Sequence, residues 1–129
     1  MRFLIFISTM LFMAAAAQAG PKDVAVVIGN KNYNADLPNA QYADRDAKLV
    51  LRFARDVLQI PQGNIIHLMD ADRLKLQGVF GDGGSTQGIL PVFLDPDGQS
   101  TLFVFYSGHA LPGTEGKSPS LLPVDVHPE

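Results

Sequence analysis

The chain contains no cysteine among its 129 residues. Disulfide bonds, thiolate metal sites and a cysteine nucleophile are therefore excluded within these residues. The chain also lacks an excess of positive charge, with ten Lys and Arg residues against 13 Asp and Glu residues. Because proteins that bind nucleic-acid backbones normally carry a basic patch, we expect no nucleic-acid partner.

One stretch is rich in glycine but lacks the residues of a phosphate-binding loop. No Lys-Ser or Lys-Thr follows the glycines of residues 81–88, GDGGSTQG, and Thr86 stands where a dinucleotide-binding fingerprint has its third glycine. We therefore expect a surface loop, and no cofactor is evident from the residues.

The first residues have the pattern of a secretory signal. Arg2 precedes an apolar run that ends at Ala17-Gln18-Ala19, a small-x-small cleavage pattern. The run is short for a membrane span, which needs about 20 apolar residues. We expect residues 1–19 to be a cleaved signal peptide and the mature protein to be periplasmic or extracellular. There are two alternatives: an uncleaved N-terminal anchor or a buried helix. We expect contact with a membrane only if the segment stays uncleaved.

Residues 20–129 have the size and composition of one globular domain, because the chain is 47% hydrophobic and 18% charged. Strands and helices alternate in the hydrophobic pattern. Buried strands are expected at residues 23–28, 64–69 and 101–106, a long helix at 40–58 with Asn39 as its N-cap, and shorter helices ending near Phe80 and spanning 88–94. A further strand-like piece covers residues 121–124, after a loop at 111–119. This order predicts an α/β fold with a mainly parallel sheet and helices on both faces.

Polar side chains follow each expected strand at its carboxyl end, where open parallel sheets bind ligands. The first strand leads to Asn30 and then to Asp44 and Asp46, the second to Asp70 and Asp72, and the third to Ser107 and His109. His109 is a candidate general base, since histidine is the side chain that most often transfers protons in enzymes. The alternative is an imidazole that only forms hydrogen bonds in a glycine turn.

The other candidates have strong structural explanations. Asp46 borders the buried face of the long helix, where a carboxylate also interacts favourably with the helix dipole. Asp70 and Asp72 fit a turn better than a metal site, because hard cations need several converging oxygens. Ser107 is a poor nucleophile for His109, since serine triads draw their members from separate elements. His67 is expected to be a half-buried strand residue.

Four segments together resemble the amino-terminal part of caspase-like cysteine peptidases, especially bacterial caspase-family and metacaspase-like proteins. They are "VAVVIGNKNY", "YADRDAKLVLRFARDVLQIPQGNIIHLMDA", "TLFVFYSGHA" and "SLLPVDV". The resemblance covers about residues 22–126 and implies a three-layer α/β/α caspase-like fold with a mainly parallel sheet, incomplete at its C-terminus. It also implies a cysteine-type endopeptidase acting on peptide or protein substrates.

The resemblance assigns roles to three residues. His109 matches the histidine of the catalytic dyad. Ala110 stands where the family has a glycine whose backbone N–H helps to bind the oxyanion, and its methyl group would be strained at a positive φ. Asp46 matches an acidic residue of the substrate pocket, so the resemblance implies substrates with Arg or Lys before the cleaved bond. Calcium is implied only by resemblance to some family members.

The nucleophile is the main departure from the family pattern. In caspases the cysteine follows the histidine by about 50 residues, which from His109 is about 30 residues beyond Glu129. The first interpretation is therefore a piece of a peptidase domain, inactive as given. The second is a non-catalytic pseudopeptidase or peptide-binding module of the same fold. The third is a small α/β ligand-binding domain in which His109 is incidental.

Overall fold

The centre of the fold is strand β1 (Val24–Gly29), whose six residues are all buried. It pairs in parallel with β2 (Ile65–Met69) on one side and with β3 (Leu102–Ser107) on the other, which gives the strand order β2-β1-β3. Short β-branched side chains on both faces of β1 are typical of a strand covered by helices on both sides. The three predicted strands and their parallel pairing are confirmed.

The computed structural model describes residues 20–34, 37–84, 87–113, 116 and 118–126. The predicted signal peptide, residues 1–19, lies outside the described residues. Within the described part of the chain, no helix is long and apolar enough to cross a membrane.

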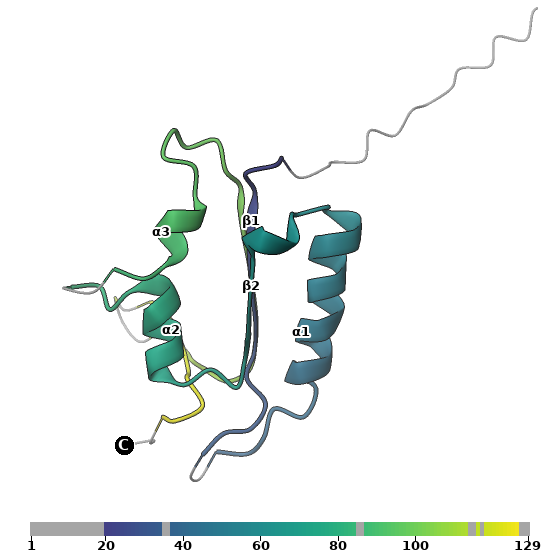
Figure 1. Cartoon of the computed structure of the whole chain (residues 1–129). Coiled ribbons are helices and arrows are strands. Elements are labelled where there is room, and N and C mark those ends of the chain that lie inside the picture. Colours follow the sequence, from purple (N-terminus) through teal and green to yellow (C-terminus); the bar gives the residue numbers. More distant parts are fainter. Residues whose placement is uncertain (1–19, 35–36, 85–86, 114–115, 117, 127–129) are drawn as a thin grey trace, which may run out of the picture.

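Helices lie on both faces of the sheet (Figure 1). Helix α1 (Ala43–Arg52) covers one face and continues as a π-helical turn, η1 (Phe53–Val57). Helices α2 (Arg73–Phe80) and α3 (Leu90–Phe93) cover the other face, and a 3₁₀ turn, η2 (Gln62–Asn64), leads into β2. The observed architecture is thus the predicted α/β arrangement with helices on both sides of a parallel sheet.

Alternate residues of β1 divide the core into two clusters, one on each face. Val24, Val26 and Ile28 face α2 and α3, whereas Ala25 and Val27 face α1. On the α1 side the neighbours are small, since Ala47 and Ala54 are fully buried against the sheet. This packing brings α1 close to β1 and fixes the direction of the residues at its first turn.

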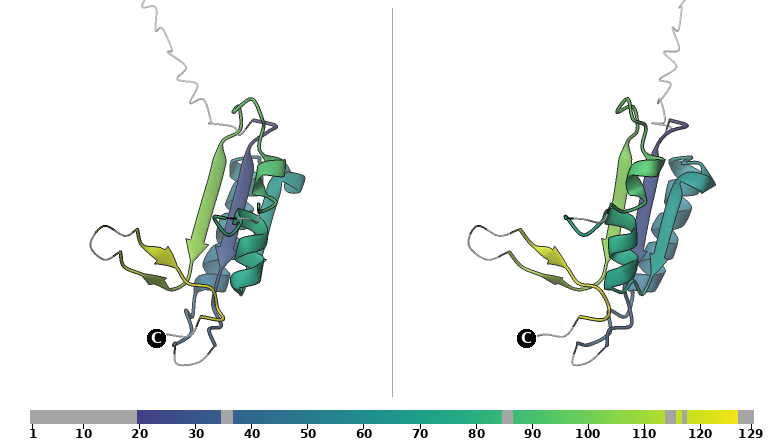
Figure 2. Two further views of the ribbon diagram at one scale, coloured as in Figure 1. Left: turned by 90° about the vertical axis from the view of Figure 1, so that its left-hand side faces the viewer. Right: turned by 60° about the vertical axis from the view of Figure 1, so that its left-hand side comes forward.

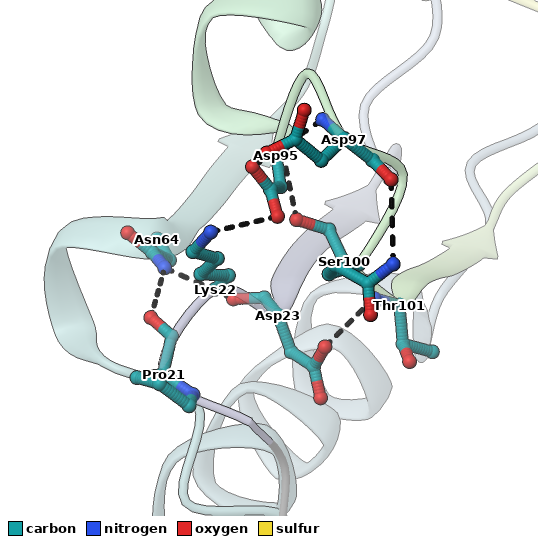
Figure 3. A network of polar contacts seen from close by, with 9 residues as sticks. Pro21, Lys22, Asp23, Asn64, Asp95, Asp97, Ser100 and Thr101 are labelled. Carbon is teal, nitrogen blue, oxygen red and sulfur yellow. Dashed lines mark hydrogen bonds and ion pairs between the residues drawn. The ribbon is translucent and has the colours of Figure 1, made fainter.

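A polar network joins the starts of the three strands (Figure 3). The Asp23 carboxylate accepts a hydrogen bond from Thr101 N at 2.7 Å, and Asn64 Nδ2 donates to the Asp23 carbonyl at 3.1 Å. Asp23 keeps a lowered pKa, chiefly because the Thr101 N–H stabilises its ionised form. Lys22 and Asp95 form an ion pair at 2.8 Å beside this network. The network aligns the strands at the end of the sheet opposite their carboxyl ends.

Two expectations for local structure are wrong. The long helix begins at Ala43 rather than at residue 40, and its N-cap is Tyr42, which makes no side-chain capping bond. Asn39 instead accepts a hydrogen bond from Tyr33 N at 3.3 Å, because Ala40 N is bound to Lys31 O and holds this segment in the loop. The strand-like piece expected at 121–124 is also misplaced, because the strand β5 (Ser120–Leu121) includes only Leu121 of it. β5 forms an antiparallel pair with β4 (Ala110–Leu111), and the pair projects from the end of β3 (Figure 2).

Candidate functional site

The three strands of the sheet end at the same level. Gly29 is paired with Met69 of β2 and with Ser107 of β3. The polar residues that follow the strands therefore emerge together, at the lower end of the sheet in Figure 1. This edge holds most of the residues that the sequence singled out, as expected for an open parallel sheet.

Gly29 allows α1 to approach this edge. A Cβ atom at Gly29 would lie 2.7 Å from both the Ala43 carbonyl oxygen and the Ala47 Cβ, so a larger residue would push α1 away. The close approach directs Asp46, in the first turn of α1, towards β3, and Ser107 Oγ donates to its carboxylate at 3.4 Å. Asp46 is exposed. The structure therefore places Asp46 beside the end of β3, accessible to a ligand.

The imidazole of His109 is held in one orientation. Its Nε2 lies 2.6 Å from the carbonyl oxygen of Pro38. Because a carbonyl only accepts, Nε2 must carry the proton, which leaves the lone pair of the neutral ring on Nδ1. The ring also contacts Tyr33, with centroids 4.6 Å apart and planes inclined by 51°. No hydrogen bond to Nδ1 is formed within the part of the chain that the structure describes, so Nδ1 is available as a base.

The backbone of His109 is held as firmly as its ring. Its N–H donates to the Tyr33 hydroxyl at 2.8 Å, and its carbonyl accepts from the Tyr106 hydroxyl at 2.8 Å and from Leu122 N at 3.0 Å. Gly108 leaves room for these contacts, since a Cβ there would lie 2.6 Å from the Tyr33 hydroxyl and 2.7 Å from that of Tyr106. The two tyrosine hydroxyls therefore leave no space for a side chain at position 108, which explains the glycine before His109.

Asn30 links the strand ends beneath His109. Its side chain is fully buried, accepts from Ala71 N at 2.8 Å, and donates to the carbonyls of Ala71 and Leu122 at 3.3 and 3.2 Å. Its own N–H donates to Ser107 O at 2.9 Å. A single amide thus joins the exits of β1 and β2 to the segment that follows β5.

The two aspartates after β2 serve the turn, as expected. Asp70 has φ 45° and accepts hydrogen bonds from the N–H groups of Lys31 and Asn32 at 2.8 and 2.9 Å. Burial opposes its ionisation, but these donors outweigh burial and lower the pKa of Asp70. Asp72 caps α2 by accepting from Lys75 N at 2.8 Å. Across the described ranges, no group of three or more His, Cys, Asp or Glu side chains converges as a metal site would require.

Ala110 follows His109 in strand β4 and is exposed. Within the described residues, the non-glycine positions with positive φ are Gln59 and Asp70. Ala110 therefore has ordinary extended backbone, and its methyl group causes none of the strain expected at a positive φ. Its role in binding an oxyanion stays a prediction.

His67 is the middle residue of β2 (Ile65–Met69) and is half-buried, as expected. Its Nε2 is buried without a hydrogen-bond partner among the described residues. Desolvation, followed by the charge of Lys48, lowers the pKa of His67 from its ordinary value of 6.5. The folded protein therefore favours a neutral imidazole at this position.

We expect this histidine to make stability fall with acidification. Below about pH 6.5 the unfolded chain binds a proton that the folded His67 resists, so the unfolded state is favoured as pH falls through this range. In thermal denaturation followed by circular dichroism, the loss of Tm from about pH 7.5 to about pH 5.5 should be smaller in His67→Gln than in the parent. Lys48→Gln should reduce it partly. Equal losses in all three proteins would contradict the assignment.

Two contributors to the site were not singled out from the sequence. Tyr33 and Pro38 contact His109 across 76 and 71 positions of the chain, respectively. No motif spacing marks such contacts. The available signal was weaker: both residues lie in the polar loop that leaves the central strand at the predicted ligand edge.

The structure thus brings His109 and Asp46 to the same end of the sheet, with the aspartates after β2 occupied in turns. It forms no hydrogen bond between Ser107 and His109 within the described residues, where Ser107 bonds to Asp46 instead. No family model, curated protein or solved structure matches the chain.

Proposed function

We propose that residues 20–129 are the histidine-bearing part of a caspase-like cysteine endopeptidase of the metacaspase type, exported by residues 1–19. The observation that carries this proposal is the orientation of His109 at the end of β3, with Nε2 held by the Pro38 carbonyl at 2.6 Å and Nδ1 left without a partner among the described residues.

The orientation suits a base that activates a thiol. A thiol placed beside Nδ1 transfers its proton to the ring, and the resulting imidazolium still donates from Nε2 to Pro38 O. The positive ring then stabilises the thiolate as it attacks the peptide carbonyl, and later protonates the leaving amine. Both steps use the orientation that His109 already has, with the thiol supplied from outside these residues.

The unpaired edge of β3 supports the proposal that the cysteine thiol comes from a segment outside these residues. β3 is an edge strand of the described sheet, although its side chains are apolar on both faces. Leu102 and Val104 are 38% and 46% exposed, in contrast to the fully buried residues of β1. Exposed apolar edges of this kind invite a further strand. A strand paired there in parallel would end beside His109, where the nucleophile is needed.

The coding sequence after codon 129 tests the proposal directly. We expect it to continue in frame and to encode a cysteine some tens of codons downstream, after a strand-like segment. The longer protein should then cleave reporter peptides with Arg or Lys before the scissile bond. A stop codon at that point would favour a non-catalytic module of the same fold, whose test is binding of such peptides without turnover.

Asp46 should contribute to the choice of substrate. Its exposed carboxylate beside β3 is placed to pair with a basic substrate side chain, so Asp46→Asn in the longer protein should lower kcat/KM for Arg reporters by about tenfold. The matched control is Asp44→Asn, which removes the same charge from a residue paired with Lys31 and Lys48. Equal effects of the two substitutions would contradict a pocket role for Asp46.

A further inference from the structure

The contacts of His109 with two tyrosines can be traced as a closed path. The His109 N–H donates to the Tyr33 hydroxyl oxygen at 2.8 Å, the two tyrosine hydroxyls lie 3.0 Å apart, and the Tyr106 hydroxyl donates to the His109 carbonyl at 2.8 Å. If Tyr33 donates to Tyr106, each hydroxyl gives one proton and accepts one. The path then begins and ends on the peptide groups of one residue.

We infer that Tyr33 and Tyr106 are positioning residues, which hold His109 in its working orientation through this ring of hydrogen bonds. The inference rests on the proposed function, because it gives the two tyrosines a role towards the proposed base. Neither hydroxyl is assigned contact with substrate.

Burial makes the ring sensitive to the loss of either member. Tyr33 is 7% exposed, and Tyr106 is half-buried at the end of β3. Desolvation, and next the hydroxyl of Tyr33, raise the pKa of Tyr106, so its hydroxyl keeps the proton that the ring requires. Removing the Tyr33 hydroxyl takes away the acceptor of the His109 N–H, and removing the Tyr106 hydroxyl takes away one of the two donors to the His109 carbonyl.

The ring also links the imidazole to the backbone. Tyr33 contacts both, since its ring lies against the imidazole while its hydroxyl accepts from the His109 N–H. Leu122 adjoins the same network, because its N–H donates to the His109 carbonyl and its carbonyl oxygen lies 3.2 and 2.8 Å from the Tyr33 and Tyr106 hydroxyls, as the alternative acceptor for their protons. A shift of the His109 backbone would therefore move Nε2 away from Pro38 O and release the tautomer.

The tautomer itself provides a readout that a general loss of stability does not change. In the ¹⁵N-labelled 129-residue chain, long-range ¹H–¹⁵N correlation should show the His109 proton on Nε2. Tyr33→Phe and Tyr106→Phe should each raise the Nδ1–H fraction about fivefold and accelerate exchange of the His109 amide by a similar factor. Because the loss of either hydroxyl opens the ring, the double variant should have an Nδ1–H fraction and an amide exchange rate only slightly above those of the single variants. The control is Tyr42→Phe, which changes the 63% exposed tyrosine.

Folded single variants that keep the parent tautomer and exchange rate would overturn the inference. If circular dichroism shows that a variant is unfolded, the test uses NMR of the parent protein instead. A slowly exchanging Tyr33 hydroxyl proton with a cross-peak to the His109 amide supports the ring, and the absence of this proton overturns the inference. The chain measured has no cysteine, so none of these outcomes depends on peptidase activity. Failure of the ring is thereby distinguished from failure of the proposed function.

Discussion

Replacing Asn30 with alanine should lower the free energy of unfolding by about 2–4 kcal/mol. The Asn30 amide makes three side-chain hydrogen bonds with no solvent exposure, to the Ala71 N–H and to the carbonyls of Ala71 and Leu122. Alanine leaves the buried Ala71 N–H without its acceptor, removes one donor from each of the two carbonyls and creates a cavity. Urea denaturation followed by circular dichroism measures the change.

The appropriate control lies four residues away. Asn34 is an exposed asparagine in the same loop, and Asn34→Ala should change the free energy of unfolding by at most about 0.5 kcal/mol. Asn30→Asp keeps the shape but loses two donors, so it should be nearly as destabilising as alanine. A small effect of both Asn30 substitutions would mean that the strand ends are held together by packing alone.

The sheet could be predicted from the sequence because its signal is local. The continuous β-branched run of β1 reports burial directly, and the spacing of five small or apolar residues predicts one buried helix face: Ala43, Ala47, Val50, Ala54 and Val57. The structure buries the three alanines and half-buries Val50, but leaves Val57, in the π-helical turn, 59% exposed. The exact start of α1 could not be predicted. Its position depends on a hydrogen bond between Ala40 and Lys31, which forms only after the loop has folded back.

The candidate site was predictable in its position and not in its detail. The carboxyl ends of parallel strands must meet at one edge, so His109 and Asp46 could be placed there from their distance to the strands. The orientation of the imidazole could not be predicted, because Pro38 and Tyr33 contact His109 from a loop more than 70 residues earlier in the chain. Asn30 was recognised as polar at a strand end, but its three bonds depend on how the exits of three segments converge.

Substitution of His109 by alanine should abolish catalysis in any polypeptide that joins residues 20–129 to the proposed nucleophile. Without the imidazole, a thiol with an ordinary pKa of about 8.5 is largely protonated at neutral pH, and the departing amine receives no proton. We expect kcat/KM for an Arg reporter to fall by about a thousandfold or more.

The control for this experiment is the histidine of β2. His67 lies in the middle of β2 in the same sheet, so His67→Gln should retain cleavage within about threefold at a pH near 8, where the parent imidazole is neutral and the substitution changes no charge. Alkylation of the cysteine by iodoacetamide separates the two roles of His109. If the imidazole both forms the thiolate and protonates the leaving amine, His109→Ala should slow alkylation at neutral pH less than it slows cleavage, because alkylation needs only the first role. Unchanged cleavage by His109→Ala would assign the base to another residue, and the hydrogen bonds around His109 would then have a purely structural meaning.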